Sequence, residues 1–515
     1  MDVNSKESKV APFLASCQDW SMIRSIFVQS VFWRVAATLS WALVSLLTLK
    51  LFRRHLSLEL YGLVGPALQV LGSLPALDGG FRATLNRRML SAGAGVESDA
   101  LAAFGQRLYS RLALTATGLG LLLLATYSFT PNAQLIQLPW PFFPLLGSCC
   151  GLVVLASSFL QQMTGVGLQR RMFILQLIMA WTSLGLLWGG FQLGAGYWSF
   201  LLSQGVPPLI SILLAVPMLR RVSPSLSILD FSWTPQDTSS LRALWPESSG
   251  VMRMQFSTLL LYTVDVYLVS WIWTGSLVSH YTLFANLFSR LRQLLQSADE
   301  AVWPLLAAKR SKGEQISAGV LRFNGWLYGA ALAVAAVCIG PFVTGFLDKT
   351  WAAAPTLATL FAARYLITGL ASQPAWWLYG HGQTRSLAGH MERELLTSLA
   401  LSLPLGAWLG PIGIAIAFLL GTLAGSLIPL PLEYARRNNR SAAEIFSVSW
   451  LRAFLAAPMA GGLAWLGLQV GGSWLYTVTF AGVATGLTLG AALALAAWKA
   501  RKAGDFNRID IANHL

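Results

Sequence analysis

Four arginines lie inside stretches of this chain that are otherwise apolar: Arg34, Arg290, Arg292 and Arg364. A cation at the centre of a bilayer costs roughly 2.5–3.5 kcal/mol on insertion scales, so each of them must face water, a partner or a ligand. The planar guanidinium group binds phosphate oxygens in pairs, which an ammonium group cannot do. We therefore take the four arginines as candidate ligands of an anionic, phosphate-containing head group. Arg34 and Arg364 could alternatively extend toward the membrane surface.

The stretch 278–305 has a divided helical pattern. At 100° per residue, Gln293 and Gln296 share one half of the helix with Arg290 and Arg292, whereas mainly leucine, phenylalanine and alanine fill the other half. Such a helix is expected to line an aqueous cavity, and the two glutamines are further candidate substrate ligands. The alternative, an amphipathic helix on the membrane surface, would leave no crossing between the apolar stretches on either side.

A narrower polar stripe runs along the stretch 25–49. Its members fall within about 40° of one another on a helix, and they are Ser30, Arg34, Thr38, Trp41, Ser45 and Thr48. We expect this stripe to face the same cavity.

Three acidic residues are candidates for ion coupling or for pairing inside the protein: Asp78, Asp265 and Asp299. Asp78 and Arg82 are four residues apart and are expected to satisfy each other. Asp265 either pairs with an arginine of the next helix, with Arg290 as the expected partner, or carries a proton or a cation.

The sequence gives little indication of metal binding, nucleotide binding or enzymatic catalysis. His381 and His390 lie near Glu392 and Glu394, but the hydropathy pattern assigns them to a cytoplasmic loop, where a solvated loop is a better interpretation than a metal site. There is no phosphate-binding glycine loop, nucleophile elbow or paired-carboxylate signature in a soluble segment. We therefore predict a transporter rather than an enzyme, with no catalytic residue, cofactor or metal.

The composition indicates a protein that crosses the membrane many times. Hydrophobic residues make up 55% of the 515 residues, charged residues only 11%, and the mean hydropathy is +0.58. Spans of about 20 residues are expected near 25–49, 61–81, 108–127, 143–166, 173–193, 198–219, 250–273, 278–305, 323–345, 355–379, 395–409, 411–432, 451–470 and 474–498. The predicted fold is all-α, with about 14 transmembrane helices.

The net charge of +15 does not indicate nucleic-acid binding. Most of the lysines and arginines fall in alternate gaps between the spans and in the two tails, as the positive-inside rule requires of cytoplasmic segments. The opposite side holds only Lys50, Arg53, Arg54 and Lys349. We therefore predict a multi-pass membrane protein with both termini in the cytoplasm, and the family resemblance described below implies the bacterial cytoplasmic membrane.

The first twelve spans repeat a six-span unit. Gly194 precedes a span that ends at Arg220, and Gly410 precedes one that ends at Arg436, at the same internal distance. Internal repeats of this kind are typical of transporters. The predicted organisation is a cytoplasmic tail (1–24), an N-lobe (25–221), a cytoplasmic linker (222–249), a C-lobe (250–437), two further spans (438–498) and a cytoplasmic tail (499–515).

Several short motifs, taken in order, resemble the polysaccharide-type flippases of the multidrug/oligosaccharidyl-lipid/polysaccharide (MOP) exporter superfamily. They are Glu59-Leu60-Tyr61-Gly62, Leu77-Asp78-Gly79-Gly80, Asp265 with Gly275 and Tyr281, and Pro304 before Lys309-Arg310. The resemblance implies two pseudo-symmetric lobes around a central cavity, alternating access driven by an ion gradient or the membrane potential, and a polyprenyl-diphosphate-linked sugar chain as cargo. The two extra spans resemble the lipid II flippase branch, where they form a groove for the lipid tail, although their glycine and alanine content equally suits simple helix packing.

The expected function is therefore export of a lipid-linked oligosaccharide for cell-surface polysaccharide synthesis. The expected partners are that substrate, membrane lipids, and polysaccharide polymerase or assembly proteins, with no nucleic acid. Two alternatives remain: a drug/cation antiporter of the same superfamily, which would prefer an acidic cavity, and a membrane-embedded glycosyltransferase or ligase, which would need catalytic carboxylates and a long outer loop.

Overall fold

The computed structural model is helical, and no strand occurs in the ranges it describes. These ranges are 20–55, 61, 80–92, 96–127, 141–166, 168–196, 198–221, 228–310, 318–346, 355–381, 383–470, 483–485 and 487–488. Within them, eight helices are long and apolar enough to cross a membrane. The predicted all-α, multi-pass fold is confirmed. The predicted spans 61–81 and 474–498 lie almost entirely outside the described residues.

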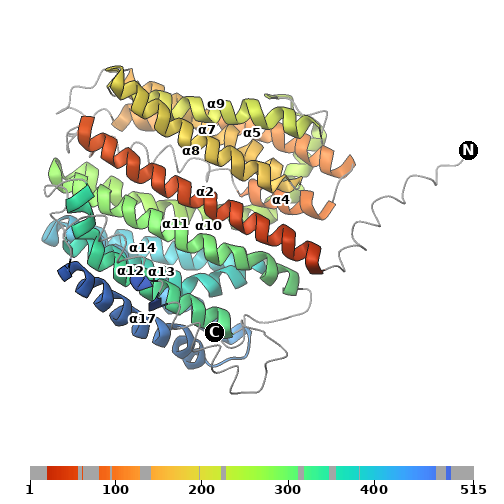
Figure 1. The fold of residues 1–515 in the computed structure, drawn as a ribbon. Coiled ribbons are helices and arrows are strands. Elements are labelled where there is room, and N and C mark those ends of the chain that lie inside the picture. Colours follow the sequence, from red (N-terminus) through yellow and green to blue (C-terminus); the bar gives the residue numbers. More distant parts are fainter. Residues whose placement is uncertain are drawn as a thin grey trace, which may run out of the picture.

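The N-lobe is formed by the first group of helices. They are α2 (Trp20–His55), α4 (Phe81–Ala92), α5 (Val96–Tyr127), α7 (Phe142–Gly165), α8 (Gln169–Gln192) and α9 (Trp198–Arg220). Helix α5 packs on α7, α8 packs on α9, and α2 packs on α8. In Figure 1 these helices occupy the upper part of the molecule, with α2 along their lower edge.

The C-lobe repeats this arrangement. Its elements are α10 (Pro235–Ile272), α11 (Ser276–Arg310), α12 (Ala318–Phe346), α13 (Pro355–Gly380), α14 (Thr384–Leu409), α15 (Pro411–Thr422), the π-helical turn η4 (Leu423–Leu427) and α16 (Pro429–Arg437). Helix α12 packs on α13, α14 on α15, and α10 on α14, the same order of neighbours as in the N-lobe. Two lobes with one packing pattern are what a duplicated unit produces.

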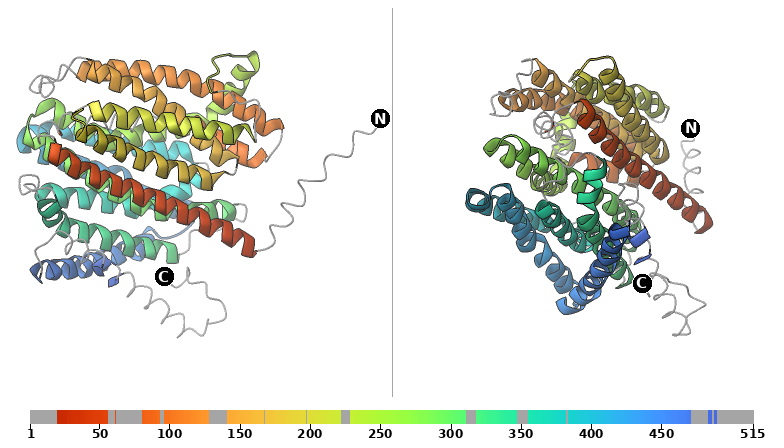
Figure 2. Two further views of the ribbon diagram at one scale, coloured as in Figure 1. Left: turned by 45° about the horizontal axis from the view of Figure 1, so that its top comes forward. Right: turned by 60° about the vertical axis from the view of Figure 1, so that its left-hand side comes forward.

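The two lobes meet along α2 and α11, which lie side by side in the views of Figures 1 and 2. Near one end of this contact, Leu49 and Phe52 of α2 belong to the same buried apolar cluster as Leu283 and Leu287 of α11. Phe346 at the end of α12 completes the cluster from the C-lobe. This end of the interface is therefore closed by apolar side chains.

Helix α10 is bound to both lobes. It begins inside the predicted linker with a capping box, in which Thr234 and Asp237 exchange side-chain-to-backbone hydrogen bonds. Arg107 of α5 donates two hydrogen bonds to the buried Asp237, at 3.0 and 2.6 Å. A Cβ on Gly80, also in the N-lobe, would lie 2.6 Å from the carbonyl oxygen of Ser248, so only glycine permits this approach. Beyond Ser248, α10 packs on α14 of the C-lobe.

Helix α17 (Ala442–Val470) packs on α12. The contact depends on small residues: a Cβ on Gly325 would lie 2.1 Å from the carbonyl oxygen of Ser449, and one on Gly329 would lie 2.6 Å from that of Ala453. Four-residue spacing of small residues lets helix backbones touch within a membrane.

One local prediction is wrong. The segment around His390 and Glu394 is not a cytoplasmic loop, because α14 begins at Thr384 and continues without interruption to Leu409. The charged residues in its first half lower the local hydropathy, so the hydropathy pattern marks only 395–409 and not the eleven helical residues before it. The backbone hydrogen bonds of a helix do not depend on that hydropathy.

Candidate functional site: the central cavity

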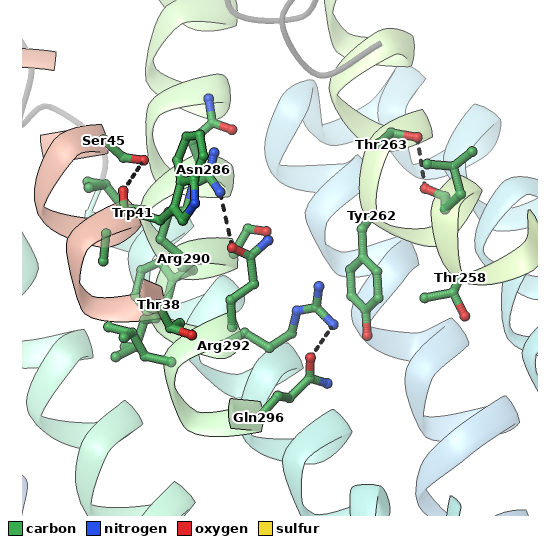
Figure 3. Close-up of a pocket in the computed structure, with 18 of the residues that line it drawn as sticks. Thr38, Trp41, Ser45, Thr258, Tyr262, Thr263, Asn286, Arg290, Arg292 and Gln296 are labelled. Atoms are coloured by element: carbon green, nitrogen blue, oxygen red, sulfur yellow. Dashed lines mark hydrogen bonds between the residues drawn. The ribbon is translucent and has the colours of Figure 1, made fainter. Parts of the chain in front are cut away.

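A cavity of about 1300 Å³ lies between the two lobes. It is lined from the N-lobe mainly by α2, α8 and α9 and from the C-lobe mainly by α10, α11 and α13. Its volume exceeds the 300–1,000 Å³ typical of sites for drug-sized ligands. Figure 3 shows part of the wall, with the polar side chains of α2 and α11 on one side and Tyr262 of α10 on the other.

The charge of the cavity is entirely positive in the part of the chain that the structure describes. Three charged side chains line it, namely Arg34, Arg290 and Arg292, and no aspartate or glutamate is among the lining residues. The remaining polar groups are neutral hydroxyls, amides and aromatic side chains, including Trp41, Trp376 and Tyr379. Such a wall attracts anions and offers no counter-charge to a cation.

Arg290 lies on the side of α11 that faces α2 (Figure 3). Its Nη1 donates a hydrogen bond to Oε1 of Gln293 at 3.1 Å, and its side chain is exposed to the cavity. Because glutamine carries no charge, this contact orients the guanidinium group without neutralising it.

Arg292 points from α11 toward the C-lobe wall (Figure 3). Its Nη1 donates to Oε1 of Gln296 at 3.1 Å, and its Cζ lies 3.6 Å from the centre of the Tyr262 ring. The residue is only 9% exposed, and its Nε is buried without a hydrogen-bond partner. A buried donor without an acceptor costs about 1–3 kcal/mol, and this Nε is covered by protein, so it does not itself face the cavity.

The described part of the predicted stripe on α2 faces the cavity, whereas the side chain of Ser30 lies outside the described residues. Arg34, Thr38, Trp41, Ser45 and Thr48 all line it. Thr38 and Ser45 satisfy their hydroxyls on the carbonyl oxygens one turn earlier in α2.

The division of α11 is less clean than predicted. Its polar residues line the cavity, with Gln293 and Gln296 among them, but Leu287, Phe288 and Leu291 line it as well. Only part of the apolar arc, such as Leu295, belongs to the core without reaching the cavity. The cavity therefore wraps farther around α11 than a half-polar helix predicts.

The expected pairing of Asp265 with Arg290 is wrong. Asp265 instead accepts a hydrogen bond from Nη1 of Arg364 at 2.8 Å, and both side chains are only 2% exposed. Tyr281 donates its hydroxyl to the same carboxylate at 3.2 Å, and Arg364 also donates to the carbonyl oxygen of Leu261. Neither Asp265 nor Arg364 lines the cavity. Arg364 is therefore placed apart from the other candidate substrate-binding arginines, which line the cavity.

Two other candidates cannot be placed. Asp78 and the side chain of Asp299 lie outside the part of the chain that the structure describes.

Sequence reasoning missed Glu394, which is only 3% exposed. Thr422 donates to its Oε1 at 2.8 Å and Ser426 donates to its Oε2, so its partners come from α15 and η4. Near it, His390 contacts Glu433 of α16 at 2.5 Å instead of a metal, and no cluster of three or more metal-ligating side chains occurs among the described residues. Ser398 and Ser402 follow Glu394 at four-residue intervals and therefore share one helical face with it. This spacing was the sequence pattern that indicated a helix here.

No known family model matches the sequence, and no curated protein matches it. Its fold does match solved structures. The lipid II flippase MurJ, in an inward closed conformation, is 14% identical over 92% of this chain and 99% of that one, with a TM-score of 0.62. An inward-facing multidrug resistance MATE family transporter of the MOP superfamily is 13% identical over 81% and 99% of the two chains, with a TM-score of 0.60.

A MOP superfamily transporter from Pyrococcus furiosus, described as having a binding pocket of reverse polarity, is 14% identical over 82% and 96% of the chains, with a TM-score of 0.54. These likenesses extend over most of each chain and include both lobes. The protein therefore has the two-lobed, all-α fold of the MOP superfamily transporters.

Proposed function

We propose that the protein is a flippase that moves a polyprenyl-diphosphate-linked oligosaccharide from the cytoplasmic to the outer leaflet for cell-surface polysaccharide synthesis. The observation that carries the proposal is the cavity charge: three arginines and no carboxylate among the described lining residues. Arg290 and Arg292 offer guanidinium groups whose hydrogen-bonding partners are neutral glutamines. A diphosphate would supply the missing negative charge and bidentate acceptors.

The rest of the cavity suits a saccharide. Trp41, Trp376 and Tyr379 offer flat aromatic faces, and the serines, threonines and glutamines of the wall offer neutral hydrogen-bonding groups. The volume exceeds that of typical drug sites, as a head group of several sugars requires. In this proposal the prenyl tail stays in the lipid beside the protein, where burial of its CH₂ groups is favourable.

A drug/cation antiporter has the same fold and is the main rival. It would need a carboxylate in the cavity to receive a cation, but Asp265 is paired with Arg364 away from the cavity. A glycosyltransferase or ligase would need acidic catalytic groups next to the substrate, and the described lining residues include none. Both rivals are therefore less well supported than a transporter of anions.

The proposal places the protein in the bacterial cytoplasmic membrane with both termini in the cytoplasm. Ser276, the first residue of α11, and Ser441, which lies between α16 and α17, are both exposed and lie at opposite ends of the helical bundle. A cysteine at position 276 should react with a membrane-impermeant thiol reagent added to intact cells, and one at position 441 should not. The reverse result would contradict the orientation.

The function is tested in a strain that lacks the protein, by measuring lipid-linked saccharide that accumulates inside the membrane and polysaccharide that reaches the surface. Wild-type protein should clear the accumulation, and the double variant Arg290→Gln with Arg292→Gln should not, although it reaches the membrane. Arg253→Gln is the matched control, because Arg253 is exposed, pairs with Glu392 and does not line the cavity. Normal export by the double variant, or efflux of a cationic dye by the wild type, would overturn the proposal.

A further inference from the structure

Arg292 is held by an aromatic ring where a carboxylate would be expected. No described carboxylate forms an ion pair with it, although only 9% of the residue is exposed. The Tyr262 ring lies 3.6 Å from Cζ of Arg292, well within the 6 Å range of a cation–π contact. The face of the ring therefore stabilises a cation that no described acidic residue neutralises.

The ring is itself fixed by its neighbours. Tyr262 stacks on Tyr365 with ring centres 6.1 Å apart and planes at 25°. Tyr365 is buried and stacks in turn on Phe288 and Phe361. Because the buried Tyr365 ring lies against it and is itself held by two buried rings, Tyr262 is restrained from turning away from Arg292.

A second cation lies near the same ring, and its charge is compensated. Cζ of Arg364 is 5.6 Å from the centre of Tyr262, but Arg364 forms the ion pair with Asp265. Two uncompensated guanidinium groups around one ring would repel each other. Asp265 neutralises Arg364 and so removes that repulsion, and the Tyr262 ring can then stabilise the charge of Arg292.

We propose that Tyr262 is a positioning residue that holds Arg292 in the cavity with its charge unneutralised, so that Arg292 can bind a phosphate group of the substrate. A carboxylate partner would compete with the phosphate for the guanidinium hydrogens, whereas an aromatic face restrains the cation and leaves its edge available. Arg292 is among the residues that line the cavity, so a ligand there can reach this side chain. The inference rests on the proposed function and adds a source of specificity. Arg292, held by Tyr262 on the C-lobe wall, favours ligands that carry a charged phosphate group.

The test is binding of geranyl diphosphate to the purified full-length protein by titration calorimetry. Tyr262→Phe keeps the ring and should bind within about twofold of wild type, whereas Tyr262→Leu should bind about tenfold more weakly, the size of a partly desolvated cation–π contact. In the Arg292→Gln background, Tyr262→Leu should cause no further loss, because its effect acts through Arg292.

Phe418→Leu is the control for simple loss of a buried ring. Phe418 lies 4.8 Å from Arg364, not against Arg292, and does not line the cavity, so binding should be unchanged. Gel filtration and a melting curve establish that each variant is folded, and Tyr262→Trp, which also retains a ring, substitutes for Tyr262→Phe if that variant does not fold.

Two results would overturn the positioning role while leaving the proposed function standing. One is wild-type affinity in Tyr262→Leu; the other is a loss of affinity in Tyr262→Leu with Arg292→Gln that equals the product of the two single losses. Absence of any binding by the wild type would instead remove the proposed function and this inference together.

Discussion

Asn286 of α11 donates a hydrogen bond from Nδ2 to the hydroxyl of Tyr61, with the two atoms 3.1 Å apart, and thereby joins the C-lobe to the N-lobe. Tyr61 is buried and packs on Phe52 at the end of α2. The same end of the interface holds the apolar cluster that both lobes share. This hydrogen bond is therefore part of the closure on one side of the cavity.

Tyr61→Phe should favour opening at this end. Loss of one neutral hydrogen bond costs about 0.5–1.5 kcal/mol, which corresponds to a roughly two- to tenfold shift between closed and open states. In the purified protein, a cysteine at Thr48, which lines the cavity near this end, should react faster with a thiol reagent. A cysteine at Gln255, which lines the cavity from α10, should react more slowly, because opening one end closes the other. Unchanged rates at both positions would show that this hydrogen bond does not influence the equilibrium.

The Asp265–Arg364 pair should be structural. Asp265→Asn or Arg364→Gln leaves one uncompensated charge among buried groups, which typically costs 3–5 kcal/mol, so each single variant should melt at a clearly lower temperature. The double variant should recover most of the stability and all of the export. Arg253→Gln, which breaks an exposed pair with Glu392, should change the melting temperature little. A double variant that is stable but does not export would show that the pair acts in transport.

Two glycines should differ in their response to alanine. A Cβ on Gly425 would lie 2.3 Å from Cβ of Glu394 and 2.6 Å from its Cα, so Gly425→Ala must push η4 away from α14. We expect a loss of about 1–3 kcal/mol in stability. Gly389→Ala is the control, because nothing lies within 4 Å of its Cβ position and alanine favours helix. Equal melting temperatures for the two variants would contradict this packing.

The stability contributed by the Arg107–Asp237 ion pair, which joins the start of α10 to α5, should depend on pH. Burial alone would raise the pKa of Asp237, but hydrogen bonds from Arg107 and Thr234 outweigh burial and lower that pKa below its ordinary value. A carboxylate with a lowered pKa adds stability that is fully present above its unfolded pKa, about 3.9, and is lost as the pH falls through the folded value.

Asp237→Asn should therefore melt below the wild type at pH 7, and the difference should shrink below about pH 4. Asp230→Asn is the control, because its carboxylate lies 3.8 Å from Arg107 and is 29% exposed. A difference between Asp237→Asn and wild type that stays constant from pH 7 to pH 3.5 would contradict the role of this ion pair.

Features within one helix were accessible from the sequence. The stripe from Arg34 to Thr48 and the polar residues of α11 line the cavity because 3.6-residue periodicity places them on one face without reference to any other helix. The all-α fold followed in the same way from the lengths of the apolar stretches.

Features that depend on which helices touch were not accessible. Asp265 and Arg364 are 99 residues apart, and no local pattern states which arginine the fold brings to the carboxylate. Glu394 was assigned to a loop because a hydropathy window counts its charge as exposed. In the structure, hydroxyls of Thr422 and Ser426 satisfy that charge from another segment.

The double attachment of α10 limits how the lobes can move. Its first turns are pinned to α5 by Arg107 and Asp237, and its later turns are packed on α14. A rod fixed at two points transmits rotation but resists sliding, so the lobes can tilt relative to each other near Ser248 and cannot shear past each other there. Pro246, which removes one backbone hydrogen bond inside the helix, is where bending costs least. We therefore expect the lobes to move relative to each other mainly by rotation and little by translation along the interface.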